Sequence, residues 1–455
     1  MMRWLPTTET LPDSACDAAA APGPYLVLAL ECARPSAGAV RYSLTGIDEV
    51  RIGRGDARRV QRAGRVLVIE VPDSALSTSH ARLLRERVGW VADDAGSKNG
   101  TRVNGAPAVR AVLCDGDVVE AAQTFFVLRT GSGTADPGDL AVDIAAGDLA
   151  TLEPQLAAAL AALDRVARAD VALLILGETG TGKEIVARAA HVLSGRRGPY
   201  VAVNCGAITP TLVASELFGH RRGAFSGASE DRAGLIRTAD GGTLFLDEVA
   251  ELAPESQAAL LRVIQEREVV PVGGTAPIKV DLRIASATCQ DLAPRVALGR
   301  FRRDLHARLA GVTLELPALR QRREDLGLLT VRLIARRTGQ PPARLDRAAA
   351  RALFGHDWPE NIRELDQRVN AALALGDATL AGVRIAPAPS EPSGAAPDPE
   401  AADAPAPSLD RDALAALLSA HRGNVSHVAK ALGTSRSQVR RLASRFGLVP
   451  EQFRS

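Results

Sequence analysis

The sequence has few cysteines, and their spacing fits neither a disulfide framework nor a zinc site. Five cysteines are scattered over 455 residues, an odd number, and no two of them form a C-x-x-C pair. Disulfide-stapled domains need an even set of cysteines, and structural zinc sites need paired ligands at short spacing. A reducing cytoplasm is therefore the better expectation.

Long apolar runs are also missing. A membrane-spanning helix needs about 20 consecutive apolar residues, and no run in this chain approaches that length. The first residues, MMRWLPTTETLPDSACD, carry acids and prolines where a signal peptide would need an apolar stretch. We expect a cytoplasmic protein with no membrane partner.

Net charge is small as well, at +2, so any nucleic-acid signal must come from local clustering. One cluster lies near the C-terminus, at Arg436, Arg440, Arg441 and Arg445. Hydrophobic residues at 46% and charged residues at 24% are typical of a folded chain. With roughly 150 residues per domain, the length predicts about three domains.

Three parts of the chain have patterns typical of folded domains. Residues 25–129 contain short apolar runs such as YLVLAL, VLVIEV, VVEA and FFVLR between turn residues, which predicts a β-sandwich or barrel. Residues 150–385 alternate strands such as VALLIL, YVAVN and TLFLDE with helical stretches, which predicts a parallel sheet flanked by helices. Residues 409–455 have only helical patterns.

The segments between these parts are predicted to be linkers. Residues 130–149 are rich in Gly and Asp, and residues 386–408 are rich in Pro, Ala and acids with little to bury. Residues 1–24 form an N-terminal extension.

A nucleotide-binding pattern follows the apolar strand VALLIL. Gly177, Gly182 and Lys183 complete G-x-x-x-x-G-K, in which backbone N–H groups wrap phosphate oxygens and the lysine reaches the β- and γ-phosphates. Glu184 stands where the general motif has the Ser or Thr that ligates Mg²⁺, so magnesium must depend on other groups. The predicted ATP-binding loop is Gly177, Glu178, Thr179, Gly180, Thr181, Gly182, Lys183 and Glu184.

An acid pair downstream completes the pattern. The strand TLFLDE ends in Asp247 and Glu248, where the first carboxylate can hold Mg²⁺ and the second can polarise an attacking water. ATP and Mg²⁺ are therefore the expected cofactors.

Six motifs in order extend the match. GETGTGKE, SELFGHRRGAFSGA, GGTLFLDEVAEL, FRRDLHARL, LPALRQRREDL and WPENIREL resemble the central AAA+ domain of sigma-54-dependent activators. In that family Glu184 is also the usual residue after the lysine. The resemblance implies an ATPase that assembles as a hexameric ring, has ATP sites between subunits and remodels sigma-54 RNA polymerase.

The resemblance also assigns roles to single residues. Asn204 would link the hydrolytic glutamate to the remodelling loop, and Thr288 would lie at the γ-phosphate sensor. Arg302 and Arg308 match the arginine fingers, and Arg363 matches the sensor arginine of the helical lid. Without the family match, the arginines of FRRDLHARL would be interpreted as a solvated basic helix face.

Two positions depart from the family pattern. The loop that contacts sigma-54 corresponds to Gly223, Ala224, Phe225, Ser226, Gly227 and Ala228. The family has Thr where Ser226 stands, and loss of its methyl group, worth about 1 kcal/mol, should weaken the contact without abolishing it. Cys289 follows Thr288 where the family usually has Asn, and a thiol is a weaker hydrogen-bonding group than an amide. Slower or less tightly coupled hydrolysis follows from this second change.

Four motifs in the first part, RIGRGD, SALSTSHARL, GSKNGTRVNG and LCDGDVV, resemble a forkhead-associated (FHA) domain. This family is a β-sandwich whose loops bind phosphothreonine peptides, although S-K-N-G-T alone is only a good turn. The resemblance assigns the phosphate contacts to Arg54, Ser77, Thr78, Lys98 and Asn99. It also gives Asn104 a role in steadying a loop, while His80 is better interpreted as architectural.

No receiver motif precedes the ATPase pattern, so control by a Ser/Thr kinase through a phosphothreonine protein is the natural hypothesis.

The last part resembles a Fis-type helix-turn-helix, in the stretch NVSHVAKALGTSRSQVRRLASRF. Small Ala429 allows two helices to cross closely, Gly433 makes the turn, and Val439 buries the second helix against the first. An upstream activating sequence on DNA would meet Ser435, Arg436, Ser437, Gln438, Arg440 and Arg441. The alternative for this stretch is a basic solvated helix in a small helical domain.

Three functions compete at this point. The first is an ATP-driven activator of sigma-54 RNA polymerase. The second is a DNA-bound phosphoprotein adaptor or repressor that uses ATP for assembly without engaging sigma-54, which Ser226 and Cys289 favour. The third, a metabolic P-loop kinase, leaves both terminal domains unexplained.

Overall fold

The structure of the protein is a computed structural model. It describes residues 21–207, 210–225, 228–377, 380 and 411–421, together with residues 425, 428, 432, 439, 443, 446, 448 and 450–453. The prediction of a Pro/Ala-rich linker over residues 386–408 lies outside the described residues.

The first domain is a sandwich of two sheets. The seven-stranded sheet has the order β13-β2-β1-β12-β11-β8-β9, and the six-stranded sheet has the order β10-β7-β6-β3-β5-β4. The strands are β1 (Tyr25–Glu31), β2 (Ala39–Ser43), β3 (Glu49–Arg54), β4 (Arg59–Ala63), β5 (Val66–Val71), β6 (Ala81–Glu86), β7 (Gly89–Asp94), β8 (Thr101–Val103), β9 (Ala106–Pro107), β10 (Arg110–Leu113), β11 (Val118–Ala121), β12 (Thr124–Arg129) and β13 (Leu140–Val142). Of the two folds that the spacing of the strands allowed, the sandwich is confirmed.

Alternation along the strands builds the sandwich core. In β5 the residues Leu67, Ile69 and Val71 are fully buried, and the residues between them are only partly buried. Because successive side chains of a strand point to opposite faces, this places one apolar face against the other sheet. Leu28 and Phe126 meet that face from the seven-stranded sheet.

Part of the predicted linker is packed. Residues 130–149 contain β13, which pairs antiparallel with β2. The buried guanidinium of Arg41 donates to the carbonyl oxygens of Pro137 at 2.7 Å and Leu152 at 2.8 Å. The segment still connects the two domains, but it has backbone partners that its Gly- and Asp-rich composition does not indicate.

The central domain contains a five-stranded parallel sheet with the order β15-β16-β19-β14-β20. Its strands are β14 (Leu173–Leu176), β15 (Tyr200–Asn204), β16 (Thr243–Asp247), β19 (Arg283–Thr288) and β20 (Val312–Glu315). The other elements are α1 (Pro154–Arg168), α2 (Lys183–Ser194), α3 (Pro210–Phe218), α4 (Leu235–Thr238), η3 (Val249–Glu251), α5 (Pro254–Glu266), β17 (Glu268–Val269), β18 (Ile278–Lys279), α6 (Leu292–Ala297) and α7 (Arg303–Leu309). The predicted alternation of strands and helices is confirmed, and it brings the carboxyl ends of the strands to one edge.

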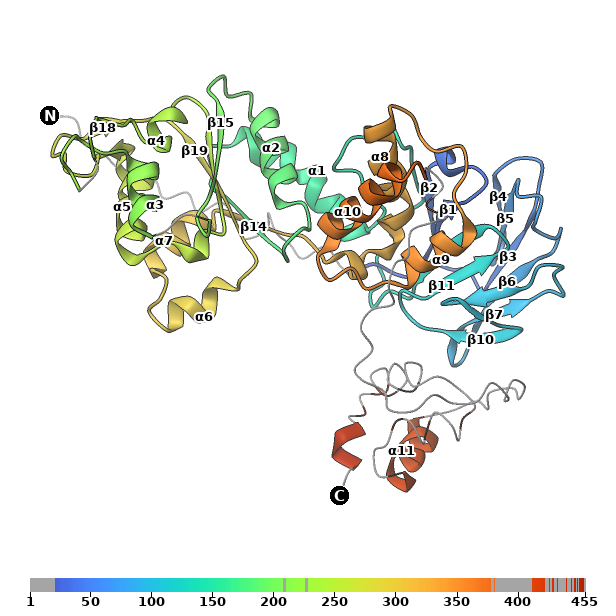
Figure 1. The fold of residues 1–455 in the computed structure, drawn as a ribbon. Helices are drawn as coiled ribbons and strands as arrows, with labels where there is room; N and C mark the ends of the chain where they lie inside the picture. The colour runs from blue at the N-terminus through green and yellow to red at the C-terminus, as the bar shows by residue number, and fades with distance from the viewer. Residues whose placement is uncertain are drawn as a thin grey trace, which may run out of the picture.

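A helical lid follows the sheet. It consists of η4 (Leu319–Gln321), η5 (Arg323–Asp325), α8 (Leu326–Thr338), α9 (Arg347–Gly355) and α10 (Asn361–Ala374). Asp346 caps α9 by accepting a hydrogen bond from the backbone N–H of Ala349 at 2.9 Å, and Gly339 ends α8 with a positive φ of 81°. Figure 1 shows the lid helices between the parallel sheet and the sandwich, and buried residues of the lid and the sandwich share one apolar cluster.

The C-terminal part is described by α11 (Arg411–Ala420), η6 (Pro450–Phe453) and single residues between them. Leu414 and Leu418 of α11 form an apolar cluster with Val428, Val439 and other buried residues. Val439 is fully buried, as predicted. Throughout the parts of the chain that the structure describes, no helix combines the length and apolar character needed to cross a bilayer.

Candidate functional site

The phosphate-binding loop lies between β14 and α2, and its glycines have backbone angles that other residues rarely adopt. Gly177, Gly180 and Gly182 have φ of 149°, 78° and 105°. A Cβ at Gly180 would also lie 2.2 Å from the carbonyl oxygen of Glu360 in the lid. Glycine at this position therefore allows both the turn and the close approach of the lid.

Lys183 begins α2 and points back over the loop. Its Nζ donates to the carbonyl oxygens of Gly177 at 2.9 Å and Glu178 at 3.2 Å, and it lies 3.9 Å from Oε1 of Glu248. The side chain is 7% exposed. The ammonium group is thus held between the loop and the acid pair, at the N-terminus of a helix that favours anions.

Asp247 and Glu248 follow β16 at the carboxyl edge of the sheet. Asn204 is the register partner of Asp247, and its Nδ2 lies 3.4 Å from Oδ2 of that carboxylate. Burial, and then the neighbouring Glu248, raise the pKa of Asp247. A cation beside this carboxylate would offset both effects.

Magnesium fits this edge with one protein ligand. Within the described ranges, no group of three or more His, Cys, Asp or Glu side chains forms a ready metal cage. Mg²⁺ in nucleotide sites is commonly held by one or two carboxylates, with phosphate oxygens and waters completing its shell. Asp247 is placed for that role.

Thr288 and Cys289 lie at the end of β19, beside β14. The hydroxyl oxygen of Thr288, which is fully buried, accepts a hydrogen bond from the backbone N–H of Gln290 at 3.0 Å. Cys289 is exposed and directs its thiol at Glu248, with Sγ 3.3 Å from Oε2. The position where the family usually has Asn thus contacts the acid pair through sulfur.

The lid contributes contacts to the loop that the sequence patterns did not predict. Nδ2 of Asn361 donates to the carbonyl oxygen of Thr179 at 2.9 Å and to Oε2 of Glu178 at 3.1 Å. Arg320 pairs with the same glutamate, with Nη1 2.8 Å from Oε2. Hydrogen bonds from Arg320 and Asn361 lower the pKa of Glu178 to about 2, so it remains ionised. Both new residues fall within motifs that match the family, LPALRQRREDL and WPENIREL, which is the signal that could have identified them.

Arg363, predicted as the sensor arginine, lies on the first turn of α10. The backbone N–H of Ile362 donates to the carbonyl oxygen of Gly180 at 2.9 Å, which fixes this turn on the phosphate-binding loop. The side chain of Arg363 is exposed. A Cβ at Gly180 would lie 3.0 Å from the Cβ of Arg363, so the base of this side chain lies beside the loop.

The two predicted arginine fingers lie elsewhere in the protomer. Arg302 precedes α7 and pairs with Asp304 at 2.7 Å, and Arg308 lies in the last turn of that helix. Both are exposed. Among the described residues, neither guanidinium forms an ion pair with the phosphate-binding loop or with the acid pair.

The predicted sigma-54 contact loop is described in part. Gly223, Ala224, Phe225 and Ala228 are described, whereas Ser226 and Gly227 lie outside the described residues. The backbone N–H of Gly223 donates to the carbonyl oxygen of Ala228 at 2.9 Å, which closes the loop. Phe225 is 41% exposed, with its ring edge-on to His220 at 5.0 Å. A large apolar side chain of this loop is thus partly exposed to solvent.

The sandwich brings the predicted phosphothreonine residues together at the ends of its strands. The backbone N–H of Arg54 donates to the carbonyl oxygen of Ser77 at 2.9 Å. A Cβ at Gly53 would lie 2.0 Å from the carbonyl oxygen of Thr78, so glycine is what lets the two segments meet. Arg54 and Thr78 are exposed.

Lys98 and Asn99 join the same group. The backbone N–H of Lys98 donates to Oγ of Ser77 at 3.1 Å, and Nδ2 of Asn99 donates to the carbonyl oxygen of Ala75 at 2.7 Å. Both side chains are exposed. One guanidinium, one ammonium, hydroxyls and an amide therefore lie on adjoining loops, as a doubly charged phosphate requires.

His80 and Asn104 support these loops. Nδ1 of His80 accepts the backbone N–H of Ser77 at 3.1 Å, so its Nε2 carries the proton and donates to the carbonyl oxygen of Gly100 at 3.2 Å. Nδ2 of Asn104 donates to Oδ1 of Asp117 at 2.8 Å. The histidine is fully buried and its role is architectural, as predicted.

The predicted DNA contacts lie outside the described residues. They are Ser435, Arg436, Ser437, Gln438, Arg440 and Arg441.

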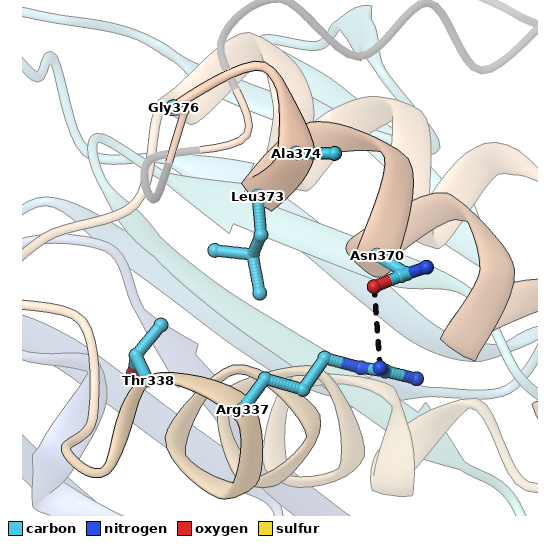
Figure 2. A pocket seen from close by; sticks show the side chains of 6 residues that line it. All are labelled: Arg337, Thr338, Asn370, Leu373, Ala374 and Gly376. Carbon is cyan, nitrogen blue, oxygen red and sulfur yellow. Dashed lines mark hydrogen bonds between the residues drawn. The ribbon is translucent and has the colours of Figure 1, made fainter.

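A hollow on the lid, drawn in Figure 2, lies apart from the predicted ATP residues. Arg337 and Thr338 from the end of α8 face Asn370 and Leu373 of α10 across it. Nη1 of Arg337 already donates to Oδ1 of Asn370 at 3.2 Å, and its Nη2 pairs with Asp366. None of the residues that line the hollow belongs to the predicted nucleotide site.

Four family models match consecutive parts of the chain. The sigma-54 interaction domain matches residues 149–315, and the AAA+ ATPase lid domain matches residues 320–397. The FHA domain matches residues 50–121, and the model of bacterial regulatory proteins of the Fis family matches residues 406–442.

Individual proteins resemble the chain over the same region. The hydrogenase transcriptional regulatory protein HoxA of Cupriavidus necator is 42% identical over 301 residues, which cover 62% of each chain. The sigma54-dependent transcriptional activator SfnR of Pseudomonas putida is 46% identical over 254 residues, which cover 53% of this chain and 69% of the relative. A crystal structure of NtrX from Brucella abortus in complex with ADP is 32% identical, has a TM-score of 0.48, and is matched over 66% of this chain and 70% of its own. The chain thus spans about 62% of the length of the first of these curated relatives.

Proposed function

Because the chain belongs to the family of sigma-54-dependent transcriptional activators, we propose that it is an ATPase that remodels sigma-54 RNA polymerase. In this proposal the protein binds DNA through its Fis-type region, assembles as a hexameric ring and is controlled by phosphothreonine recognition at its FHA domain. The observation that carries the proposal is the convergence of Lys183, Asp247 and Glu248 at one edge of the parallel sheet.

In the proposed hydrolysis of ATP, separate residues bind the phosphates, hold Mg²⁺ and orient the attacking water. Backbone N–H groups of residues 177–182 and the ammonium of Lys183 bind the phosphates of ATP. Asp247 would hold Mg²⁺, which would supply positive charge to offset that of the phosphates. Glu248 orients the attacking water, and Thr288, the last residue of β19, lies at the γ-phosphate sensor position.

Completion of the site requires a second protomer. Arg302 and Arg308 are exposed, at the start and in the last turn of α7. An arginine finger stabilises the charge of the phosphoryl transition state when a neighbouring subunit supplies it. Exposed arginines at α7 are available for that role, which supports the proposal that hydrolysis takes place in a ring.

The loop that carries Phe225 transmits the conformational change of the ring to sigma-54. Asn204 was predicted to link the hydrolytic glutamate, Glu248, to the contact loop, and its side chain contacts the neighbouring Asp247. Its Oδ1 also accepts the backbone N–H groups of Gly206 and Ala207, so a change at the acid pair can reach the segment that leads to α3. Phe225 would pack against sigma-54, with Ser226 supplying a hydroxyl beside it.

The two terminal domains control the ATPase and direct it to a site on DNA. Arg54, Ser77, Thr78, Lys98 and Asn99 bind phosphothreonine on a protein that a Ser/Thr kinase has modified. The polar and basic residues of the Fis-type region, which include Arg436 and Arg440, bind an upstream activating sequence.

The test is ATPase rate against protein concentration, measured for the wild type and for Lys183→Ala. We expect a rate per protomer that rises steeply as the ring assembles, and no hydrolysis by the variant, with DNA binding retained. Unchanged turnover in Lys183→Ala would remove the assignment of the site.

Transcription separates this function from that of an adaptor or repressor that does not engage sigma-54. The presence of Cys289 beside Glu248 favours that alternative, because a thiol replaces the usual amide. Transcription from a sigma-54 promoter, lost in Phe225→Ala while ATP hydrolysis persists, supports the activator. Absence of transcription by an active wild-type ATPase supports the adaptor.

A further inference from the structure

The seven-stranded sheet of the sandwich is apolar on both faces. Along β1, Leu26 and Leu28 face the core of the sandwich, whereas Tyr25, Val27 and Ala29 join the apolar cluster of the lid. A sheet with one face in water would alternate apolar and polar residues. The outer face is therefore built to be covered, and the lid covers it.

The contact is close at the level of backbone and rings. The rings of Phe125 in β12 and Phe354 in α9 stack with centroids 5.2 Å apart and an interplanar angle of 11°. A Cβ at Gly327 of α8 would lie 2.1 Å from the carbonyl oxygen of Ala29. This fit is as tight as that within a domain core.

Two buried carboxylates have their partners across the contact. Glu120 of β11 is 3% exposed, and Arg351 of α9 donates to both of its oxygens at 2.8 and 2.7 Å. Glu324 of η5 is fully buried and accepts a hydrogen bond from the hydroxyl of Tyr25 at 2.9 Å. A buried carboxylate is costly unless it is paired or neutral, so these partners define one register of the two domains.

The lid side of this contact leads to the nucleotide site. Arg322, which is buried, donates from Nη2 to the carbonyl oxygen of Thr181 in the phosphate-binding loop at 2.9 Å. Two residues later, Glu324 meets Tyr25 of the sandwich. One short turn therefore touches the phosphate-binding loop and the sandwich together.

The sandwich side leads to the phosphothreonine loops. Arg58 lies four residues after Arg54, and its Nε donates to Oε1 of Glu31 at 2.7 Å. Glu31 ends β1, and the carbonyl oxygen of the next residue, Cys32, accepts the backbone N–H of Leu345 from the lid at 2.8 Å. The segment from Arg54 to Arg58 is thus connected to the lid by an ion pair and a backbone hydrogen bond.

We propose that the outer face of the sandwich is a docking surface for the lid of its own chain, and that this docking couples phosphothreonine binding at Arg54 to ATP binding at Lys183. The inference rests on the proposed function for its two ligands. By linkage, a phosphopeptide changes the affinity for ATP by the same factor by which ATP changes the affinity for the peptide. A coupling of typical size makes that factor about 5 to 150.

The experiment uses the full-length protein and two probes, a fluorescent non-hydrolysable ATP analogue and a phosphothreonine peptide selected from a degenerate library. The affinity for each is measured with and without a saturating amount of the other. We expect a change of at least about fivefold, equal in both directions. Two ligands that bind independently overturn the inference and leave the proposed function intact, whereas failure to bind either probe defeats the proposed function itself.

Variants at the contact between the sandwich and the lid test, without the peptide, whether this contact affects the phosphate-binding loop. Arg351→Glu reverses the charge opposite Glu120, and the double variant Glu120→Arg with Arg351→Glu restores the pair. We expect the single variant to lose hydrogen-exchange protection in β11 and β12 and to change affinity for the ATP analogue about fivefold or more, with both effects recovered in the double variant.

Arg337→Glu is the matched control, since it reverses a lid charge whose partner, Asp366, lies in the lid itself. It should leave β11 and β12 protected and the affinity for the ATP analogue unchanged. Exchange that does not change in Arg351→Glu would show that the surfaces are not docked. Lost protection with unchanged affinity would show that docking does not reach the phosphate-binding loop.

Discussion

The thiol of Cys289 donates a hydrogen bond to Oε2 of Glu248 at 3.3 Å, and the backbone N–H of the cysteine reaches the same oxygen at 3.2 Å. Partial burial, together with the hydrogen bond to Glu248, raises the pKa of Cys289, so the thiol keeps its proton and acts as a donor. Asn204 is directed instead to Asp247. The glutamate proposed to orient water is thus held by a backbone N–H and by a side-chain donor that is weak.

Replacing this cysteine by the amide of the family should speed hydrolysis. In Cys289→Asn, a stronger donor at the same position would hold Glu248 more firmly, and a gain of about 1 kcal/mol corresponds to roughly fivefold in kcat. Steady-state ATPase assays at saturating ATP measure the change. Cys114→Ser, which changes a cysteine of the sandwich, should have no effect, and equal or slower turnover in Cys289→Asn would contradict the role given to the thiol.

The nucleotide site could be predicted from the sequence because its parts are local. Gly177, Gly182 and Lys183 are close in the chain, and a strand that ends in Asp247 and Glu248 needs only parallel neighbours to bring the acids to the loop. The strands around them followed from short apolar runs. These patterns do not specify how side chains are oriented, and so the contact of Cys289 with Glu248 was not predicted.

The docking of the sandwich on the lid was not predicted, although a signal was present. YLVLAL has no polar residue, and a strand in a half-exposed sheet would alternate. The partner of that face could not be identified, because Glu324 lies 299 positions from Tyr25 and Arg351 lies 231 positions from Glu120. β13 was missed for a related reason, since Leu140–Val142 pairs with β2 and has a weak pattern of its own.

The fingers should act on a neighbouring site, which a mixing experiment can show. Lys183→Ala lacks a working site but keeps its fingers, and Arg308→Ala lacks a finger but keeps its site. Each alone should lose ATPase activity by on the order of a thousandfold. An equimolar mixture should regain a measurable fraction of the wild-type rate, because some sites are then completed by an intact neighbour.

Arg303→Ala provides the control for that mixture. Arg303 is an exposed arginine at the start of α7, so its loss removes the same charge from the same helix without removing a proposed finger. It should hydrolyse ATP at nearly the wild-type rate. A mixture of the two inactive variants that stays inactive would place Arg308 outside catalysis in trans.

Arg54→Ala should weaken binding of a phosphothreonine peptide by about 10- to 100-fold, the cost of roughly 1.5 to 3 kcal/mol for a lost charged hydrogen bond. Arg85→Ala removes an exposed arginine from β6 of the same domain and should bind like the wild type. Fluorescence anisotropy with the phosphorylated and unphosphorylated peptides measures both. Equal affinity of Arg54→Ala and the wild type would remove the arginine from the phosphate site.

Docking of the sandwich on the lid should weaken as the pH rises, because of Glu324. Burial raises the pKa of this carboxyl from 4.5 to about 7, against the opposing effect of Arg129, with Asp325 and Tyr25 as its other close groups. A raised pKa in the folded state means that the docked form holds a proton that the separated form releases between these values. The free energy that protonated Glu324 contributes to docking is therefore fully present below about pH 4.5. It is lost as the pH rises through about 7, and its full size is about 3 kcal/mol.

Glu324→Gln isolates this effect, because its neutral amide can accept the hydrogen bond of Tyr25 at every pH. Hydrogen exchange of β1 and β12 is compared between variant and wild type at the same pH, which cancels the pH dependence of intrinsic exchange. The wild type should match the variant near pH 5 and lose protection relative to it toward pH 8. Glu255→Gln, at an exposed carboxylate of α5, should follow the wild type throughout. A wild type whose protection relative to Glu324→Gln is constant over this range would mean that Glu324 does not titrate within the contact, and the pH dependence assigned to docking would have to be abandoned.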